Sequence, residues 1–435
     1  MTTESPIRIR HLSFSDLDGG AARAAYRLHG GMVAAGADSK FLVRHKLSDD
    51  QTVLPLYGSR LGQFLSYHRA GIDRLPVRVL HPRLQAPWFF SNWVPDLLSS
   101  HSEISRADVI QLHWVSGGFL RPESLMSFKK PLFWRLSDFW PFSGGCHYPA
   151  DCMKYERTCG ACPQLGSLSD SDISRWCWNR KNSAYQGLNL TVVAPSNWIA
   201  DCARKSSLFN RFPVEVIHNG IDLQLFRPIR RESALEALGL PTNRRYILFG
   251  AIHGTSDERK GFTYLREALK QLQGYHLRET TELLIFGSTQ PIHSSDLGFP
   301  VRSLGVLKDN LSLVIAYNAA DVFVAPSIEE NFSSTVLEAV ACGRPVVVFN
   351  TGGMPDLVTH QQNGFLATVR DAADLAAGIQ WVLDDQPRQE ALGKASRTRA
   401  EIEFSLPRQT EKYLYLYKSA FEKTKSQKAD GRISA

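Results

Sequence analysis

Residues 326–355 read PSIEENFSSTVLEAVACGRPVVVFNTGGMP. One apolar run, Val322–Ala325, leads into this stretch, and a second, Pro345–Asn350, lies within it. Between the two runs, Thr335–Cys342 has a helical pattern. This order predicts a strand, a loop, a helix and another strand, which is the repeating unit of a sheet covered by helices.

The same alternation runs through the whole chain in two series. In the first half, apolar runs stand at Ile7–Leu12, Lys40–Arg44, Asp108–Trp114, Pro131–Leu136, Leu190–Ala194 and Val214–Ile217. In the second half, they also stand at Tyr246–Gly250 and Glu282–Gly287, and helical patterns such as Ala21–Ala35 and Gly261–Leu272 separate the runs. We predict an α/β protein with two doubly wound, Rossmann-like domains.

The predicted domains are residues 1–218 and 219–405, and a helix at 406–427 is expected to pack back on the first domain. Ligands of doubly wound sheets bind outside the carboxyl ends of the strands. The expected site is therefore the central cleft that the two domains face.

Charge is distributed unevenly along the 435 residues, whose 50 Lys and Arg against 43 Asp and Glu give a net charge of +7. The first 200 positions hold 22 basic and 16 acidic residues, whereas the other 235 hold 28 and 27. A basic half favours anionic partners, namely nucleic acid, anionic lipid or a phosphorylated substrate. No run approaches the ~20 apolar residues of a membrane-spanning helix, and the start of the chain lacks a signal pattern. We expect a cytoplasmic protein that could lie at the inner face of the membrane.

Two carboxylates, Glu330 and Glu338, flank the turn at Asn331–Thr335. Ser334 or Thr335 is the expected N-cap of the following helix, whose free N–H groups suit a phosphate. A carboxylate at each end could bind two hydroxyl-bearing parts of one ligand. Taken alone, such a pair is more often a helix start with ordinary surface acids.

The stretch resembles the signature of retaining glycosyltransferases of family 4, which have the GT-B fold: Pro-Ser, an acid, a turn with Phe, then Glu-Ala-x-Ala-Cys-Gly-x-Pro-Val. The resemblance implies that Glu330 contacts the donor sugar and Glu338 holds the ribose hydroxyls of the nucleotide. It implies that turn amides, at Ser333, Ser334 and Thr335, bind the diphosphate. Asn331 and Ser333 stand where many members have Gly.

The resemblance extends over most of the chain. Lys260, before Gly261, matches the lysine that binds the donor diphosphate. The arginine that many members carry after the first strand of this domain is missing, because Ala251 and Ile252 stand there, and Arg259 is the candidate replacement. Leu307 falls where backbone groups usually hold the nucleobase.

In the first domain, Gly19 and Gly20 match the family's first loop, where glycines let the backbone approach the donor. His113 matches a strand-end histidine that approaches the donor sugar and acceptor, although a lone histidine in an apolar strand is usually a core residue. Asp138 lies in WRLSDFWPFSGGCHY, residues 134–148, which resembles a branch acting in polysaccharide synthesis. Ser137 stands where that branch has a histidine. The resemblance thus implies catalytic roles for Glu330, Lys260, His113 and Asp138.

Four cysteines are clustered, with the spacing C-x5-C-x6-C-x2-C: Cys146, Cys152, Cys159 and Cys162. Four thiols can supply a tetrahedral, structural zinc site, and His147 could replace one of them. Buried reduced thiols and disulfides are the alternatives. The resemblance implies that catalysis itself requires no metal.

Residues 60–75 place Leu61, Phe64, Leu65, His68, Ile72 and Leu75 on one helical stripe, accompanied by Arg60, Arg69, Arg74, Arg78 and Arg83. A basic amphipathic helix suits anionic lipid, so the segment 60–83 is a candidate membrane contact. The alternative is a core-facing helix with a solvated basic face.

The leading hypothesis is a retaining hexosyltransferase that moves a sugar from a nucleotide diphosphate sugar to a hydroxyl of a growing, lipid-linked exopolysaccharide or cell-surface glycan. A sugar-nucleotide epimerase, a phosphorylase and a degenerate, non-catalytic glycosyltransferase scaffold are alternatives on the same fold. No recognised nucleic-acid motif is present, and the cysteines lie in an aromatic-rich segment, so we do not expect a nucleic-acid partner.

Overall fold

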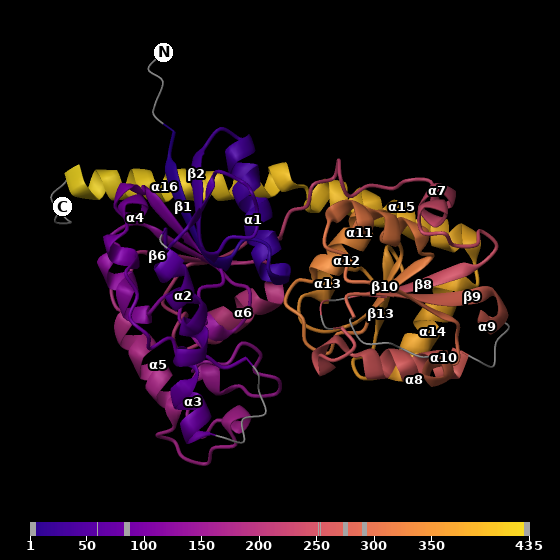
Figure 1. Ribbon diagram of the computed structural model, residues 1–435, viewed down its shortest axis with the longest axis horizontal. Helices are drawn as coiled ribbons and strands as arrows, with labels where there is room; N and C mark the ends of the chain where they lie inside the picture. Colours follow the sequence, from indigo (N-terminus) through magenta and orange to yellow (C-terminus); the bar gives the residue numbers. More distant parts are fainter. Residues whose placement is uncertain are drawn as a thin grey trace. The chain divides into compact units, whose positions relative to one another are not determined.

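The computed structural model describes residues 6–58, 60–81, 88–250, 252, 254–272, 277–288 and 294–429. The chain divides into two compact units, unit 1 with residues 1–218 and 409–435 and unit 2 with residues 219–408. Each unit contains one sheet of parallel strands with its own helices (Figure 1). The predicted pair of parallel-sheet, Rossmann-like domains is confirmed.

The sheet of unit 1 has seven strands in the order β3-β2-β1-β4-β5-β6-β7. The strands are β1 (Arg8–Ser15), β2 (Asp38–His45), β3 (Val53–Pro55), β4 (Val109–Leu112), β5 (Leu132–Arg135), β6 (Leu190–Ala194) and β7 (Val214–Val216). Strands β4 and β5 are buried at every position, as expected of parallel strands covered on both faces. The strand order reverses between β1 and β4, which pair from Ile9↔Val109 to Leu12↔Leu112.

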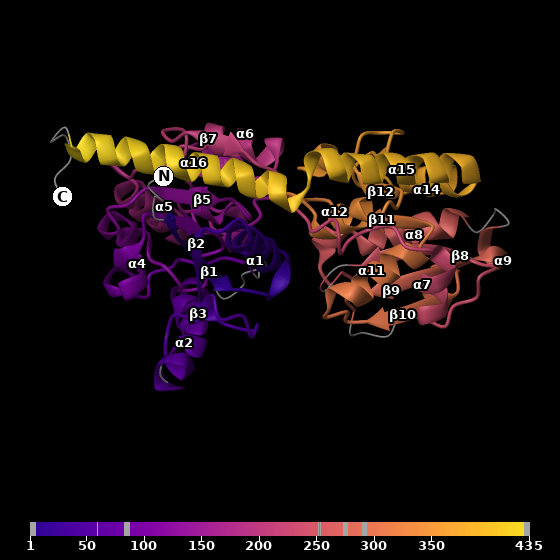
Figure 2. The ribbon, with the colours of Figure 1, turned by 90° about the horizontal axis from the view of Figure 1, so that it is seen from above.

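The helices of unit 1 are α1 (Gly19–Ala34), α2 (Arg60–Asp73), α3 (Leu75–Leu80), α4 (Ser102–Arg106), α5 (Ile173–Ala184) and α6 (Asn197–Lys205). Helix α16 (Leu406–Ala429) continues into this unit from position 409 and lies along it (Figure 2). Its Tyr413 and Tyr417 are fully buried in a cluster with Ile9 and Phe133. The Tyr417 hydroxyl also donates a 2.7 Å hydrogen bond to Gln111 Oε1 of β4. Both apolar and polar contacts therefore attach the C-terminal helix to the first sheet.

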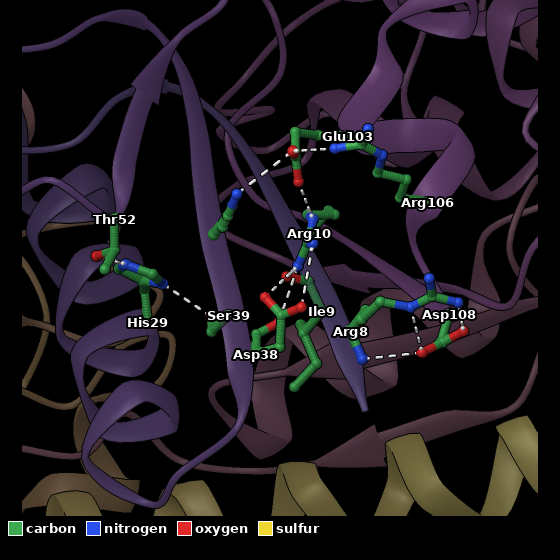
Figure 3. Close-up of polar contacts among 11 residues, drawn as sticks. Arg8, Ile9, Arg10, His29, Asp38, Ser39, Thr52, Glu103, Arg106 and Asp108 are labelled. Atoms are coloured by element: carbon green, nitrogen blue, oxygen red, sulfur yellow. Dashed lines mark hydrogen bonds and ion pairs between the residues drawn. The ribbon is translucent and has the colours of Figure 1, made fainter. Parts of the chain in front are cut away.

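Ion pairs hold together the amino-terminal edge of this sheet (Figure 3). The Arg10 guanidinium of β1 is 2% exposed and lies 2.7 Å from Glu103 Oε2 and 3.0 Å from Asp38 Oδ1. At the start of the same strand, Arg8 lies 2.8 Å from Asp108, with nearly half of its own side chain exposed. These ion pairs stabilise the amino edge of the sheet. Ligands of such sheets bind at the opposite, carboxyl edge.

Arg10→Ala is expected to lower the unfolding free energy of unit 1 by about 3 kcal/mol, because it leaves the Glu103 carboxylate buried without its main partner. Arg8→Ala is the matched control on the same strand. Its partly exposed pair predicts a loss of about 0–1 kcal/mol. Urea denaturation of both variants compares them, and equal losses would contradict this interpretation.

The sheet of unit 2 has six strands in the order β10-β9-β8-β11-β12-β13. The strands are β8 (Arg245–Gly250), β9 (Thr281–Phe286), β10 (Val301–Gly305), β11 (Val322–Ala325), β12 (Val346–Phe349) and β13 (Gly364–Ala367). The helices are α7 (Arg231–Ala237), α8 (Phe262–Leu272), α9 (Leu277–Thr280), α10 (Ser294–Leu297), α11 (Asn310–Ala319), α12 (Ser334–Ala341), α13 (Met354–Leu357), α14 (Ala372–Leu383) and α15 (Gln386–Glu403). Here the order reverses between β8 and β11, so the loops that follow these two strands meet at one edge.

Short 3-10 turns complete the described secondary structure: η1 (Leu98–Ser100), η2 (Pro122–Ser127), η3 (Trp140–Phe142), η4 (Lys154–Glu156), η5 (Pro163–Leu165) and η6 (Glu258–Lys260). Every predicted strand is present, with ends shifted by a few residues. The predicted N-cap of α12 is wrong, because Ser333 rather than Ser334 or Thr335 takes that place: its Oγ accepts from the Val336 N–H at 3.3 Å. Within the described residues, the helices are too short or too polar to cross a membrane.

Candidate functional site

The carboxyl edge of the unit 2 sheet carries an ion pair between residues 70 positions apart. Lys260 Nζ, in the turn before α8, donates a 2.6 Å hydrogen bond to Glu330 Oε2, in the loop after β11. Burial raises the pKa of the Glu330 carboxyl, but the charge and hydrogen bond of Lys260, together with the charge of Arg259, outweigh burial and leave the pKa below its usual value. The Glu330 carboxylate is therefore ionised at neutral pH, and its contact with Lys260 is an ion pair.

Two glycines allow the loops of this site to touch through their backbones. Gly261 has a φ of +70°, and a Cβ added to it would lie 1.8 Å from the carbonyl oxygen of Pro326. Gly352 has a φ of +54°, and its added Cβ would lie 1.9 Å from the carbonyl oxygen of Glu330. The Gly353 N–H also donates to that oxygen, at 3.0 Å. Contacts to the loop of Glu330 from both sides fix its position.

Gly261→Ala is expected to displace the Lys260 turn from the loop of Glu330, because no side chain fits against Pro326. Gly239→Ala is the control: Gly239 has a similar φ of +63°, but an added Cβ there meets nothing within 4 Å. We expect about 1–2 kcal/mol of destabilisation from the control, which is the cost of a left-handed alanine, and more from Gly261→Ala. Thermal unfolding measures both, and an equal effect would show that the close approach is unimportant.

The remaining donor-side residues surround this pair. The Arg259 guanidinium lies 2.5 Å from Asp257 Oδ2. The backbone carbonyl of Arg259 accepts a hydrogen bond from the Ile328 N–H at 2.8 Å. Arg259 therefore contacts the loop of Glu330 through its backbone, while its side chain forms an ion pair with Asp257. Ala251 lies outside the described residues, and Ile252 is exposed.

Helix α12 begins at the turn that follows Glu330. Ser333 caps it, and the Ser333 hydroxyl lies 3.1 Å from that of Thr335. Ser334 opens the helix, so the N–H groups of Ser334 and Thr335 are the ones that could meet an anion, whereas that of Val336 is bonded to the Ser333 hydroxyl. One turn further on, Glu338 is 3% exposed. Leu307 follows β10 and is partly buried against the core of unit 2.

The carboxylate of Glu338 has a partner that the sequence did not reveal. Tyr317 of α11 is fully buried, and its hydroxyl donates a 2.9 Å hydrogen bond to Glu338 Oε2. This bond fixes the orientation of the carboxylate. Only the packing of α11 against α12 brings the two residues together, so no spacing rule could have found Tyr317.

In unit 1, the predicted residues form separate groups. Gly19 has a φ of +86° at the start of α1, and Gly20 follows it in the helix, so the loop after β1 turns tightly into α1. His113 is 1% exposed, and its Nε2 lies 2.9 Å from Nδ1 of His11, with the two rings stacked. Burial lowers the pKa of both histidines well below the usual value, so both rings are neutral. His113 stays a predicted catalytic residue, now with a buried neighbour that the sequence analysis missed.

Asp138 is 4% exposed, and three hydrogen bonds use its oxygens. Oδ2 accepts from Nδ1 of His147 at 2.6 Å and from Nε1 of Trp114 at 2.8 Å. Oδ1 accepts from the Trp140 N–H at 2.9 Å. Three protein donors thus hold the carboxylate, and a catalytic role for Asp138 would have to operate with these hydrogen bonds in place.

The four clustered cysteines line one small cavity of about 20 Å³, next to Tyr155 and Lys154. All four are free thiols, and burial raises the pKa of Cys159 to about 12 and that of Cys146 well above its usual range. As they stand in the described part of the chain, no three His, Cys, Asp or Glu side chains are arranged to hold a metal ion. The zinc site at Cys146, Cys152, Cys159 and Cys162 therefore stays a prediction.

Among their described side chains, helices α2 and α3 bury one apolar side chain, that of Val77. Ser66, Asp73 and Val77 face inward. The α2–α3 patch, defined as the exposed Phe64, Ile72, Leu75, Val79 and Leu80, faces solvent. Three members of the predicted apolar stripe, Phe64, Ile72 and Leu75, are thus exposed rather than core-facing. Arg83 and the side chains of Arg60, Leu61 and Leu65 lie outside the described residues.

Comparison with known proteins connects unit 2 to a family. Residues 231–399 match the family described as Glycosyl transferases group 1, and this span includes Lys260, Glu330 and Glu338. A D-inositol 3-phosphate glycosyltransferase of Mycolicibacterium smegmatis is 33% identical over 196 residues, 44% of each chain. D-inositol 3-phosphate glycosyltransferase 1 of Catenulispora acidiphila is 30% identical over 257 residues, which cover 54% of this chain and 60% of that one. The aligned part thus spans less than two thirds of either relative.

Solved structures resemble the chain over nearly its whole length. Sucrose-phosphate synthase from Thermosynechococcus elongatus has a TM-score of 0.65 at 19% identity and covers 96% of this chain and 99% of its own. Anabaena Alr3699/HepE, solved in complex with UDP-glucose, has a TM-score of 0.63 at 18% identity and covers 95% and 100%. At these identities the likeness shows the fold, which is that of GT-B glycosyltransferases.

Proposed function

We propose that the chain is a retaining hexosyltransferase of family 4, which transfers a sugar from a nucleotide diphosphate sugar to an acceptor hydroxyl. The observation that carries this proposal is the Lys260–Glu330 pair, held at the carboxyl edge of unit 2 beside the start of α12. A cation, free helix N–H groups and two fixed carboxylates match the parts of a nucleotide diphosphate sugar. The match of residues 231–399 to Glycosyl transferases group 1 and the UDP-glucose complex of Anabaena Alr3699/HepE support it.

Each group has a distinct role in the proposed reaction. The Lys260 ammonium and the first N–H groups of α12 stabilise the negative charge that develops on the leaving diphosphate. Glu330 accepts hydrogen bonds from sugar hydroxyls, and Glu338, oriented by Tyr317, accepts from the ribose. The bond between the anomeric carbon and the phosphate oxygen breaks, the bond to the acceptor oxygen forms on the same face, and the acceptor proton passes to the leaving phosphate. No covalent enzyme intermediate and no metal is required.

The proposed acceptor is a hydroxyl of a growing, lipid-linked glycan. The α2–α3 patch supports this choice, because Phe64 and Val79 are 62% and 74% exposed and α3 also carries the exposed Arg78. Such a surface fits an anionic lipid face, where apolar side chains insert and cations remain at the headgroups. D-inositol 3-phosphate is the second candidate acceptor, favoured by the names of the relatives.

Nucleotide release tests the proposed reaction. With a nucleotide diphosphate sugar, we expect free nucleoside diphosphate to accumulate faster when a lipid-linked glycan or D-inositol 3-phosphate is added. A sugar-nucleotide epimerase would change the donor sugar without releasing nucleotide. A non-catalytic scaffold would bind the donor and release nothing.

The α2–α3 patch predicts binding to anionic vesicles. Replacing Phe64 and Val79 by Ser is expected to weaken binding to phosphatidylglycerol vesicles about a hundredfold or more, because burying each of the two apolar side chains contributes about 1.5 kcal/mol or more. The control is Leu168→Ser, since Leu168 is 98% exposed but lies outside the patch. Vesicle co-sedimentation measures both. Unchanged binding of the double variant, or equal loss in the control, would contradict membrane docking through this patch.

A further inference from the structure

The point where the strand order of unit 1 reverses carries two aromatic side chains. Phe14 lies near the end of β1, and Trp114 lies two positions after β4. The Phe14 N–H donates to the Trp114 carbonyl at 2.8 Å, and the two rings meet edge to face with centroids 5.2 Å apart. Both side chains are partly exposed. In open α/β sheets, ligands bind outside the carboxyl ends of the strands at this reversal, so Trp114 lies where a ligand of unit 1 is expected.

A chain of buried polar groups fixes the indole of Trp114. Its Nε1–H donates to Asp138 Oδ2 at 2.8 Å, and the same oxygen accepts from His147 Nδ1 at 2.6 Å. The other ring nitrogen of His147, Nε2, lies 3.2 Å from the Ser116 hydroxyl. Asp138, His147 and Ser116 are each at most 4% exposed. A fully bonded network of this kind holds the plane of the one partly exposed member, Trp114.

A glycine next to the two rings limits how closely they are packed. Gly117 has a φ of +68°, and a Cβ added to it would lie 3.2 Å from the Phe14 ring and 3.7 Å from Cη2 of Trp114. A side chain at this position would therefore crowd both rings. Other side chains do contact the pair: Arg44 lies 5.0 Å over the Phe14 ring, and the His147 ring lies 5.3 Å from that of Trp114. The glycine adds no further covering to them.

We propose that Trp114 is the stacking platform for a hydroxylated six-membered ring, a pyranose or a cyclitol, in the acceptor of the reaction. The axial C–H bonds of such a ring are attracted to the negative face of an aromatic system. Asp138, His147 and Ser116 act as positioning residues that hold the indole. That the ring belongs to the acceptor rests on the proposed function, whereas the binding of such a ring to Trp114 does not.

The same three groups have the order of a hydrolytic Ser-His-Asp triad, with Ser116 Oγ 3.2 Å from His147 and His147 2.6 Å from Asp138. A nucleophile must meet its substrate, and Ser116 is 1% exposed. Trp114 Nε1 donates to the same Asp138 oxygen as His147, and a hydrolytic triad has no such second donor. Positioning of the indole accounts for the two hydrogen bonds that Asp138 Oδ2 accepts.

Indole NMR tests the platform directly in the full chain. The protein is labelled with ¹⁵N at tryptophan and titrated with methyl α-D-glucopyranoside, methyl α-D-mannopyranoside and myo-inositol; Trp114→Phe identifies the signal of Trp114. We expect at least one of these probes to move the Trp114 signal while the signal of Trp176, which is 43% exposed on α5, stays in place. No movement of the Trp114 signal, or equal movement of Trp176, would overturn the proposal.

A double-mutant cycle separates positioning from simple structural support. In Asp138→Asn, the amide has one accepting oxygen and no charge, so either the Trp140 N–H loses its acceptor or both Trp114 Nε1 and His147 Nδ1 lose the oxygen that they share. We expect about a tenfold loss of affinity for the responding probe in Asp138→Asn and in Trp114→Phe, and no further loss when the two are combined. Additive losses would overturn the inference that Asp138 acts through Trp114.

Titration with UDP-glucose tests donor binding separately from ring binding at Trp114. If no nucleotide diphosphate sugar binds but the probes still move the Trp114 signal, the transferase proposal fails and the platform stands. If the donor binds and no probe moves the Trp114 signal, the stacking platform is wrong while the transferase proposal stands.

Discussion

Glu330→Gln is expected to lower the rate of sugar transfer by about 10²- to 10³-fold while the fold of unit 2 is retained. The amide has nearly the shape of the carboxylate but only one accepting oxygen and no charge. It therefore loses hydrogen bonds to the donor sugar and the ion pair with Lys260. The loss should fall on kcat, because the carboxylate orients the reacting sugar. Steady-state kinetics with a saturating nucleotide sugar measures this effect.

The neighbouring Glu329→Gln is the control for this prediction. It removes the same charge one position earlier, in the same loop, and keeps both members of the Lys260–Glu330 pair. We expect a change of a few-fold at most. If Glu330→Gln transfers sugar at the full rate, or if both variants lose activity equally, the role assigned to Glu330 is wrong.

Lys260→Met is expected to lower kcat by a similar ~10²- to 10³-fold, because no cation remains beside the leaving diphosphate. It should also raise the pKa of Glu330, since burial already acts in that direction and Lys260 supplies the largest of the effects that oppose burial. At neutral pH the variant then holds a buried carboxylate without its partner. NMR titration of Glu330 and the rate of transfer measure the two effects.

The double variant Lys260→Met, Glu330→Gln separates catalysis from stability. Removing both charges leaves neither group unpaired, so the double variant should be more stable than Lys260→Met alone while remaining inactive. A double variant that is less stable than the single one would mean that the two residues do not act as a pair. Thermal unfolding decides this.

Most strands that the sequence predicted are long or mainly apolar, and β7, which has three residues and the exposed Glu215, is the exception. Val322–Ala325 and Leu190–Ala194 have the ends that the apolar runs indicated. Three edge or near-edge strands were missed for physical reasons: β3 has three residues and ends in Pro55, β10 carries the exposed Arg302 and Ser303, and β13 begins at a glycine. Such strands gain their structure from pairing with a neighbour rather than from local propensity.

The candidate site was predicted in part. The family resemblance indicated Lys260 and Glu330 separately, but their 2.6 Å contact depends on the close backbone approaches at Gly261 and Gly352, which no local pattern encodes. Tyr317 beside Glu338 depends likewise on helix packing. These partners lie far apart in the chain, so distances in the folded state were needed to find them.

Unit 1 shows the same limit more strongly. The sequence offered His113 and Asp138 as isolated residues at strand ends. The structure adds His11 to the first and joins the second to His147 and Trp114. A strand-end residue can be recognised from pattern, whereas the hydrogen bonds that decide its role come from neighbouring strands and loops.

Calorimetric titration of the full chain with UDP-, GDP-, ADP- and dTDP-linked sugars tests the central claim most directly, because it measures donor binding before any acceptor is known. We expect one of these donors to bind with a Kd in the range of about 1 µM to 1 mM, typical of enzyme substrates. Lys260→Met should weaken that binding at least tenfold, while the control Glu329→Gln leaves it unchanged. Binding of none of the nucleotide sugars, or equal binding by wild type and Lys260→Met, would contradict a donor site at Lys260 and Glu330.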